Sequence, residues 1–101
     1  MKNVILSADG DSKVYSVPDA VADELYKHCL YFCNKWLRLS TDAEKYRRRG
    51  GAVCYNEDDF IEYLNCWKYP DQPSVLVENL GWISRESDIP EQYRRCPRFN
   101  F

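Results

Sequence analysis

The feature that most constrains this chain is a wide apolar arc within residues 18–39. Apolar side chains recur there at spacings of three and four residues and form two adjoining stripes: Val21, Leu25, Cys29, Phe32 and Trp36 in one, and Tyr26, Leu30, Cys33 and Leu37 in the other. Pro18 is favoured at the first position of a helix, and Asp19 suits its positive end. An arc this wide predicts a long central helix that is covered on two sides.

Two short segments before this helix have the pattern of a β-hairpin. Residues 2–8 and 13–17 are rich in valine, isoleucine and tyrosine, and an Asp-Gly pair lies between them. Such a pair between strand-forming segments favours a hairpin turn. Because a hairpin alone is marginally stable, it has to pack on a helix. We therefore predict a single α+β domain over residues 1–101, with the N-terminal β-hairpin packed on the long central helix and two to four shorter helices.

The shorter helices are expected after residue 40. Thr41 and Glu44 form a capping box for a second helix, which runs through the arginines at 47–49 to a pair of glycines. Asn56 caps a third helix, whose first turn is acidic. The buried face of this third helix is expected to be Phe60, Ile61, Leu64 and Trp67.

The segment 74–80, SVLVENL, is ambiguous between a strand and a short helix. Gly81 follows it in the position of a helix C-cap, so the pattern favours a helix. A last helical turn is expected near Tyr93.

The composition and charge exclude several classes of protein. Hydrophobic residues make up 45% of the chain, charged residues 30%, and the formal net charge is −2. This mix excludes an acidic disordered chain, and the charge excludes a global field that attracts DNA or an anionic membrane. The charge is nevertheless segregated. Residues 34–51 carry six basic and two acidic side chains, whereas residues 52–91 carry two basic and nine acidic ones.

Nothing in the sequence marks export or membrane insertion. The apolar stretch near the N-terminus is too short for a signal peptide, and no run approaches the roughly 18 apolar residues that span a bilayer. The chain has five cysteines, an odd number. We therefore expect a cytoplasmic protein with reduced thiols.

Several stretches, taken together, resemble one group of small bacterial proteins. They are NVILSADGDSKVYSVPDAVAD, GGAVCYNEDDFIEYLN, SVLVENLGWI and CPRFNF. They are similar to small uncharacterised proteins of gut clostridia and their relatives, often linked to mobile elements, and the similarity covers nearly the whole chain. The group has no known activity, so the resemblance implies no catalytic residues. It implies a bacterial cytoplasm and a mobile-element setting, in which small proteins often inhibit host defence enzymes.

One pair of cysteines has a spacing that metal sites use. Cys29 and Cys33 lie four residues apart on one helix face, and Cys54, Cys66 or Cys96 would complete a zinc site with them. The spacing departs from the short CxxC pattern, and both residues fall on the apolar arc. Because free cysteine is among the most buried residue types, we favour core packing and expect no metal and no cofactor.

No pattern in the chain indicates catalysis. His28 is the single histidine, and adjacent helix positions diverge, so it does not share the face of Cys29 and Cys33. The sequence has no nucleophile elbow, no GxGxxG and no phosphate-binding loop of the Walker type. We therefore predict that the chain is not an enzyme.

The remaining residue types favour a module that binds a larger protein. Aromatic and arginine side chains dominate interface hot spots. The candidate contact residues, which lie in or near expected loops, are Tyr46, Arg47, Arg48, Arg49, Tyr69, Trp82 and Arg85. The most specific hypothesis is an anti-CRISPR-like inhibitor of a host defence nuclease, in which acidic side chains mimic phosphate groups. Those acidic candidates are Glu57, Asp58, Asp59 and Glu62.

A nucleic-acid-binding accessory factor is the alternative hypothesis. It would use the basic segments 45–49 and 94–98, with arginines on phosphates and Tyr46 stacked on a base. The acidic residues 52–91 are able to neutralise both segments, and the whole chain is net negative. The sequence therefore favours a protein partner over nucleic acid, and no membrane partner.

Overall fold

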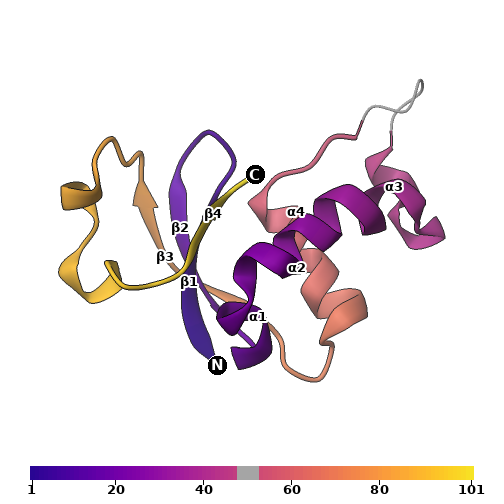
Figure 1. Ribbon diagram of the computed structural model, residues 1–101, viewed down its shortest axis with the longest axis horizontal. Helices are drawn as coiled ribbons and strands as arrows, with labels where there is room; N and C mark the ends of the chain where they lie inside the picture. The colour runs from indigo at the N-terminus through magenta and orange to yellow at the C-terminus, as the bar shows by residue number, and fades with distance from the viewer. Residues whose placement is uncertain (48–52) are drawn as a thin grey trace.

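The structure, a computed structural model, describes residues 1–47 and 53–101 and is built on a four-stranded sheet (Figure 1). The strands are β1 (Lys2–Ser7), β2 (Ser12–Val17), β3 (Val75–Gly81) and β4 (Arg98–Asn100), in the spatial order β3-β2-β1-β4. Neighbouring pairs β1–β2 and β2–β3 are antiparallel, whereas β1 and β4 are parallel. The predicted α+β class is confirmed.

The N-terminal hairpin is present as the sequence predicts. Lys2 pairs with Val17 at one end and Leu6 with Lys13 at the other. Asp9 adopts a left-handed conformation in the turn, with φ at 55°. The side chain of Asn100 secures this turn, because its Oδ1 accepts a hydrogen bond from the Asp9 amide at 2.9 Å. The C-terminal strand therefore closes the sheet beside β1.

The long central helix predicted over residues 18–39 is interrupted, so that prediction is wrong in its length. The chain instead forms α1 (Asp19–Asp23), α2 (Leu25–Tyr31), η1 (Phe32–Trp36, a π-helical turn) and α3 (Leu37–Leu39). Glu24 leaves the helical conformation, with φ −132° and ψ 45°. The break lets α1 pack beside the start of β1 while the run from Leu25 onward takes another direction (Figure 1).

The two helices after residue 40 differ in how well their starts were predicted. The first is η2 (Thr41–Tyr46), a 3-10 helix that begins one residue earlier than expected, because Ser40 accepts the capping hydrogen bond from the Asp42 amide. It does not continue through Arg47, which is extended and bridges to Val53. The predicted continuation through 48–49 lies outside the described residues.

The second of these helices is α4 (Glu57–Tyr63), which continues as η3 (Leu64–Lys68, a π-helical turn). Its predicted cap is confirmed, since Asn56 and Asp59 form a reciprocal capping box. Three of the four residues expected on its inner face are buried, whereas Trp67 is partly exposed beside Trp36.

The segment 74–80 forms most of strand β3, so the helix favoured by the sequence is wrong. Its residues pair with β2, from Ser16 opposite Val75 to Ser12 opposite Gly81. Gly81 has φ at 73°, a conformation that favours glycine, but it ends a strand rather than a helix. Two short 3-10 turns follow, η4 (Glu86–Asp88) and η5 (Glu91–Tyr93), the second where a turn near Tyr93 was expected.

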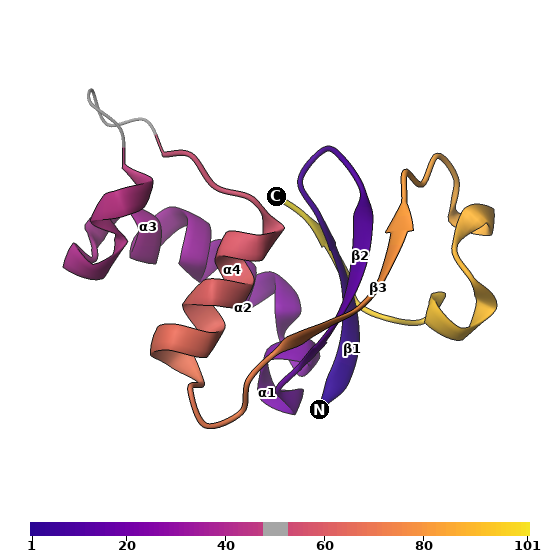
Figure 2. The ribbon, with the colours of Figure 1, turned by 180° about the vertical axis from the view of Figure 1, so that it is seen from behind.

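The sheet separates two apolar clusters. The larger lies between the sheet and the helices and includes Val4, Leu6, Tyr15 and Val17 from the strands. The smaller lies on the opposite face, where Ile5 and Val14 pack under Ile89 and Tyr93. Figure 2 shows the helices on one side of the strands and the segment after β3 on the other. Within the described residues, no helix is long and apolar enough to cross a membrane.

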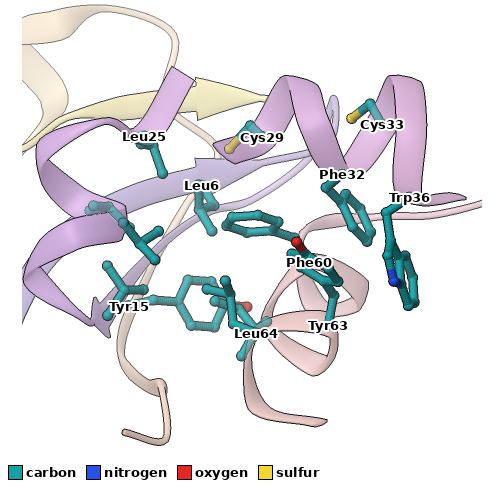
Figure 3. Packing of buried hydrophobic residues seen from close by; sticks show 14 of the residues in the cluster. Leu6, Tyr15, Leu25, Cys29, Phe32, Cys33, Trp36, Phe60, Tyr63 and Leu64 are labelled. Carbon is teal, nitrogen blue, oxygen red and sulfur yellow. The ribbon is translucent and has the colours of Figure 1, made fainter. Parts of the chain in front are cut away.

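The ring of Phe32 lies among several aromatic side chains of the larger cluster, near Trp36, Phe60 and Tyr63 (Figure 3). It is fully buried, and its centroid lies 5.2–6.1 Å from those of five aromatic rings: Trp36, Tyr55, Phe60, Tyr63 and Phe101. Phe60 and Tyr63 belong to α4, whereas Phe101 follows β4. One side chain therefore joins both helical runs to the C-terminal end of the sheet.

We predict that Phe32→Ala lowers the free energy of unfolding by about 3–5 kcal/mol, the usual cost of removing a large buried ring. Leu39→Ala is the control, because Leu39 lies on the same helical run and is 78% exposed. It should change stability by less than about 0.5 kcal/mol. Chemical denaturation measures both, and equal effects of the two substitutions would contradict the assigned core.

Candidate interaction surface

Tyr46 was predicted to contact a partner, but in the structure it is buried. Its side chain is buried in the larger cluster, 6.0 Å from the ring of Trp36. Tyr46 is therefore a core residue and is unable to stack on a base. Arg47 is partly engaged as well, since its guanidinium donates a hydrogen bond to the Leu37 carbonyl at 3.0 Å. Arg48 and Arg49 lie outside the described residues.

The acidic candidates on α4 mostly contact groups within the chain. Glu57 is buried and pairs with Lys13 at 3.1 Å, so its expected place on an exposed acidic surface is wrong. Asp58 also pairs with Lys13, at 3.3 Å, and accepts a hydrogen bond from the Tyr15 hydroxyl. Asp59 caps the helix, and burial raises the pKa of its carboxyl.

Glu62 completes this set through an ion pair with Lys45. The hydrogen bond from Lys45 lowers the pKa of the Glu62 carboxyl and raises the pKa of the Lys45 ammonium. Glu57 and Asp58 therefore anchor α4 to β2, and Glu62 anchors it to η2, whereas Asp59 caps α4 itself. Sequence reasoning missed this role because Lys13 and Lys45 are distant in the chain.

Three predicted contact residues lie nearer the surface. Tyr69 is half-buried against the larger cluster, with its ring 6.4 Å from that of His28. Trp82 and Arg85 are exposed, as the sequence suggested for residues in loops. Trp82 directly follows β3, and Arg85 lies three residues further along the chain.

Strand β3 is an apolar surface that the sequence analysis did not identify. Val75, Leu76 and Val77 are 55%, 54% and 45% exposed, and Trp82 just beyond them is 67% exposed. The run of three apolar residues in SVLV was the available signal. It was not recognised because the sequence pattern of this segment is ambiguous between a strand and a short helix, and the helix was favoured.

The position of β3 is fixed at both of its ends by asparagine side chains. Asn65 of η3 makes two hydrogen bonds to the backbone of buried Ser74: its amide donates to the carbonyl at 3.0 Å, and its Oδ1 accepts from the amide at 2.6 Å. At the other end, Asn79 accepts from the Gly81 amide at 2.8 Å and donates to Asp11 at 3.2 Å. The strand is therefore held in place although its side chains are exposed.

One edge of β3 is free in the part of the chain that the structure describes. β3 is the outer strand of the sheet, so its second edge presents backbone N–H and C=O groups without a paired strand. Natural edges are often protected by lysine or proline, but VLVENLG contains neither and carries one charge, Glu78. Such an edge is suited to pairing with an extended segment of another chain.

The cysteines are distributed over the whole fold. Cys29 and Cys33 are buried in the larger cluster, as the sequence analysis favoured. Burial raises the pKa of both thiols. Cys96 packs with the smaller cluster on the other face of the sheet, whereas Cys54 and Cys66 are exposed. Among residues 1–47 and 53–101, no three histidine, cysteine or acidic side chains are placed to hold a metal ion.

We predict that Asn65→Ala loosens the start of β3. Removing both hydrogen bonds leaves the buried Ser74 backbone unpaired, which should cost about 1–3 kcal/mol. Amide exchange at Val75 and Leu76 should accelerate in this variant. Cys66→Ser, an exposed change on the same turn, is the control and should leave these rates unaltered. Unchanged exchange in Asn65→Ala would show that other contacts hold the strand.

The chain is similar in sequence to a known iron–sulfur protein. No family model matches the sequence, and no solved structure matches it. The chain is 32% identical over 71 residues to high-potential iron-sulfur protein isozyme 2 of Halorhodospira halophila, a match that covers 67% of this chain and 92% of that protein. On this identity and coverage, the chain belongs by sequence to the family of that high-potential iron-sulfur protein.

Proposed function

We propose that the protein is a non-enzymatic module that binds a larger protein through the outer edge of β3. The observation that carries this proposal is the run of half-exposed apolar residues, Val75 to Val77, on a strand with one unpaired edge. A partner segment added to this edge would pair with the free backbone groups and cover the valine and leucine side chains. Backbone pairing would supply affinity, and the side chains would supply specificity.

Trp82 and Arg85 extend this surface beyond the strand. Tryptophan and arginine are the residue types most enriched in interface hot spots. Trp82 directly follows Gly81, whose φ is 73°, and it is 67% exposed, so its side chain is open to a partner. These two residues keep the contact role that the sequence suggested for them.

The most specific form of the proposal is a cytoplasmic inhibitor of a host defence nuclease, encoded by a mobile element. The resemblance to proteins of gut clostridia supports this setting, and free cysteines are consistent with a reducing compartment. Phosphate mimicry by the acids of α4 has less support, because Glu57 is buried and the other three have partners within the chain. The inhibitor would instead act by adding a strand of its target to β3.

The alternative, a nucleic-acid-binding factor, has weaker support. Arg94 donates to the Ile89 carbonyl at 3.0 Å, and Arg98 pairs with Glu86 at 3.0 Å. Arg47 is held by the Leu37 carbonyl, as described above. The described arginines of the two basic segments are thus mostly engaged within the fold, and Arg95 remains on the surface.

The name of the relative raises the question of an iron–sulfur cluster in this chain. Such clusters are held by cysteine thiolates, four for the [4Fe–4S] type, around one centre. Here Cys29 and Cys33 pack in one core, Cys96 packs in the other core across the sheet, and Cys54 and Cys66 are exposed. This placement does not fit a single cluster, so we propose no electron-transfer step for the chain.

We predict that protein purified without chelators contains well below one iron or zinc atom per chain. Elemental analysis measures both metals, and a visible absorption spectrum detects any cluster. Stoichiometric iron or zinc that is lost in a Cys29→Ser, Cys33→Ser double variant would contradict the placement of these thiols in the core.

We predict that Val77→Lys abolishes partner binding without unfolding the protein. A lysine on an edge strand opposes strand addition, whereas a change at a half-exposed position should alter stability by less than about 0.5 kcal/mol. The experiment is affinity purification from the host with quantitative mass spectrometry. The wild type should retain one protein in stoichiometric amount, and Val77→Lys and Trp82→Ala should each reduce it at least about tenfold.

Arg95→Ala is the matched control, because Arg95 is an exposed side chain that lies outside the proposed surface. It should retain the partner at the wild-type level. The proposal fails if Val77→Lys captures the same protein as well as the wild type. Recovery of nucleic acid that depends on Arg95 and is removed by moderate salt would favour the alternative function.

A further inference from the structure

A cleft of about 480 Å³ lies between the two helical runs, and its chemistry differs from that of the β3 edge. One wall is a stripe along α2 and η1 that includes Lys27, His28, Tyr31 and Lys35. Tyr63 and Lys68 from α4 and η3 line the other wall. Figures 1 and 2 show these two runs crossing on the same side of the sheet. The volume is within the range of small-molecule sites.

The cleft carries an excess of positive charge. Lys27 is paired with Glu24 at 3.2 Å, and Glu24 is the one acidic residue of the lining. Lys35 and Lys68 form no ion pair with any described carboxylate, and all acidic residues of the chain lie in the described ranges. Two ammonium groups are therefore available to an anion.

Neutral polar and aromatic groups complete the lining. Burial and the nearby Lys68 lower the pKa of His28, so its imidazole is neutral at pH 7 and offers a hydrogen bond rather than a charge. Burial raises the pKa of Tyr63 to about 12, so its hydroxyl stays protonated. The ring of Tyr31 is about half exposed and provides a flat apolar surface.

Both walls contain a π-helical turn. Lys35 belongs to η1 and Lys68 to η3. π-Helical residues make up well under 1% of protein structure, and such turns are frequent at functional sites. Two of them line this cleft, and each carries one of the unpaired lysines, which is consistent with a functional site.

We propose that the cleft binds a small phosphate ester that carries a planar ring, the class to which nucleoside monophosphates belong. Lys35 and Lys68 bind the phosphate as point charges, and Tyr31 stacks on the ring. We expect tight binding only from a ligand that has both a ring and a phosphate, because the lining combines free ammonium groups with an exposed aromatic face. This inference does not depend on the protein-binding role of β3.

Titration calorimetry of the full chain with adenosine monophosphate tests the proposal. We expect saturable binding with a Kd on the order of 10–100 μM. Inorganic phosphate and adenosine, tested separately, should each bind at least about tenfold more weakly, since each satisfies one half of the site. Absence of saturable binding of adenosine monophosphate to the folded protein overturns the proposal.

Variants assign the binding to the named residues. Lys35→Gln and Lys68→Gln should each weaken binding of adenosine monophosphate at least about tenfold, the expected effect of losing one charge-assisted hydrogen bond. Tyr31→Leu should weaken it similarly without altering the response to inorganic phosphate. Arg95→Gln removes one exposed positive charge outside the cleft and should have no effect.

Two results of this series contradict the assignment. The first is an equal loss of affinity in Arg95→Gln and in the two lysine variants, which would reveal attraction by overall charge. The second is binding of a ten-residue oligoadenylate a hundredfold more tightly than adenosine monophosphate through the same lysines. That result would show that the cleft binds single-stranded nucleic acid rather than a small phosphate ester.

Discussion

The packing of aromatic rings around Phe32 is the interaction on which the rest of this structure depends. Phe32 contacts Phe60 and Tyr63 from the second helical run and Phe101 from the C-terminal end. These rings come from three distant parts of the sequence, so their burial fixes how the helices lie on the sheet. Five ring contacts at one residue also explain why the break at Glu24 is tolerated, because tertiary packing rather than helix length positions α2.

Other parts of the chain cover both faces of the sheet. Among the described residues, unpaired backbone N–H and C=O groups of the sheet are therefore found at its two outer strands, β3 and β4. β4 pairs with β1 and is joined to the hairpin turn by Asn100, but it spans only Arg98–Asn100, so that edge is short. β3 is longer, and it is held at its ends by Asn65 and Asn79 while its apolar side chains face solvent. A rigid strand with exposed apolar side chains is costly to maintain without a function, and this contrast supports the proposed binding role.

The sequence predicted correctly those turns and helix ends that are indicated by residues close together in the chain. The Asp-Gly turn and the Asn56 cap are indicated by neighbouring residues, and both are present in the structure, although Asn100 also holds the turn. The strand at 74–80 was missed because its conformation is set by pairing with β2, about sixty residues earlier in the chain. The acids of α4 were likewise misassigned, since their partners Lys13 and Lys45 are brought near by folding. Exposure of Trp82 was predicted, whereas the apolar edge beside it was not, because the run SVLV signals an edge strand only once its pairing with β2 is known.

Residue-resolved amide exchange of the free protein at low concentration tests the central claim that the outer edge of β3 is open. In an antiparallel pair, alternate amides point away from the neighbouring strand. The account predicts that about every second amide of β3 exchanges nearly as fast as a loop, while the amides of β1 and β2 that pair with each other are strongly protected. Uniform protection along β3, equal to that of β1, would show that the edge is already covered and would contradict the account.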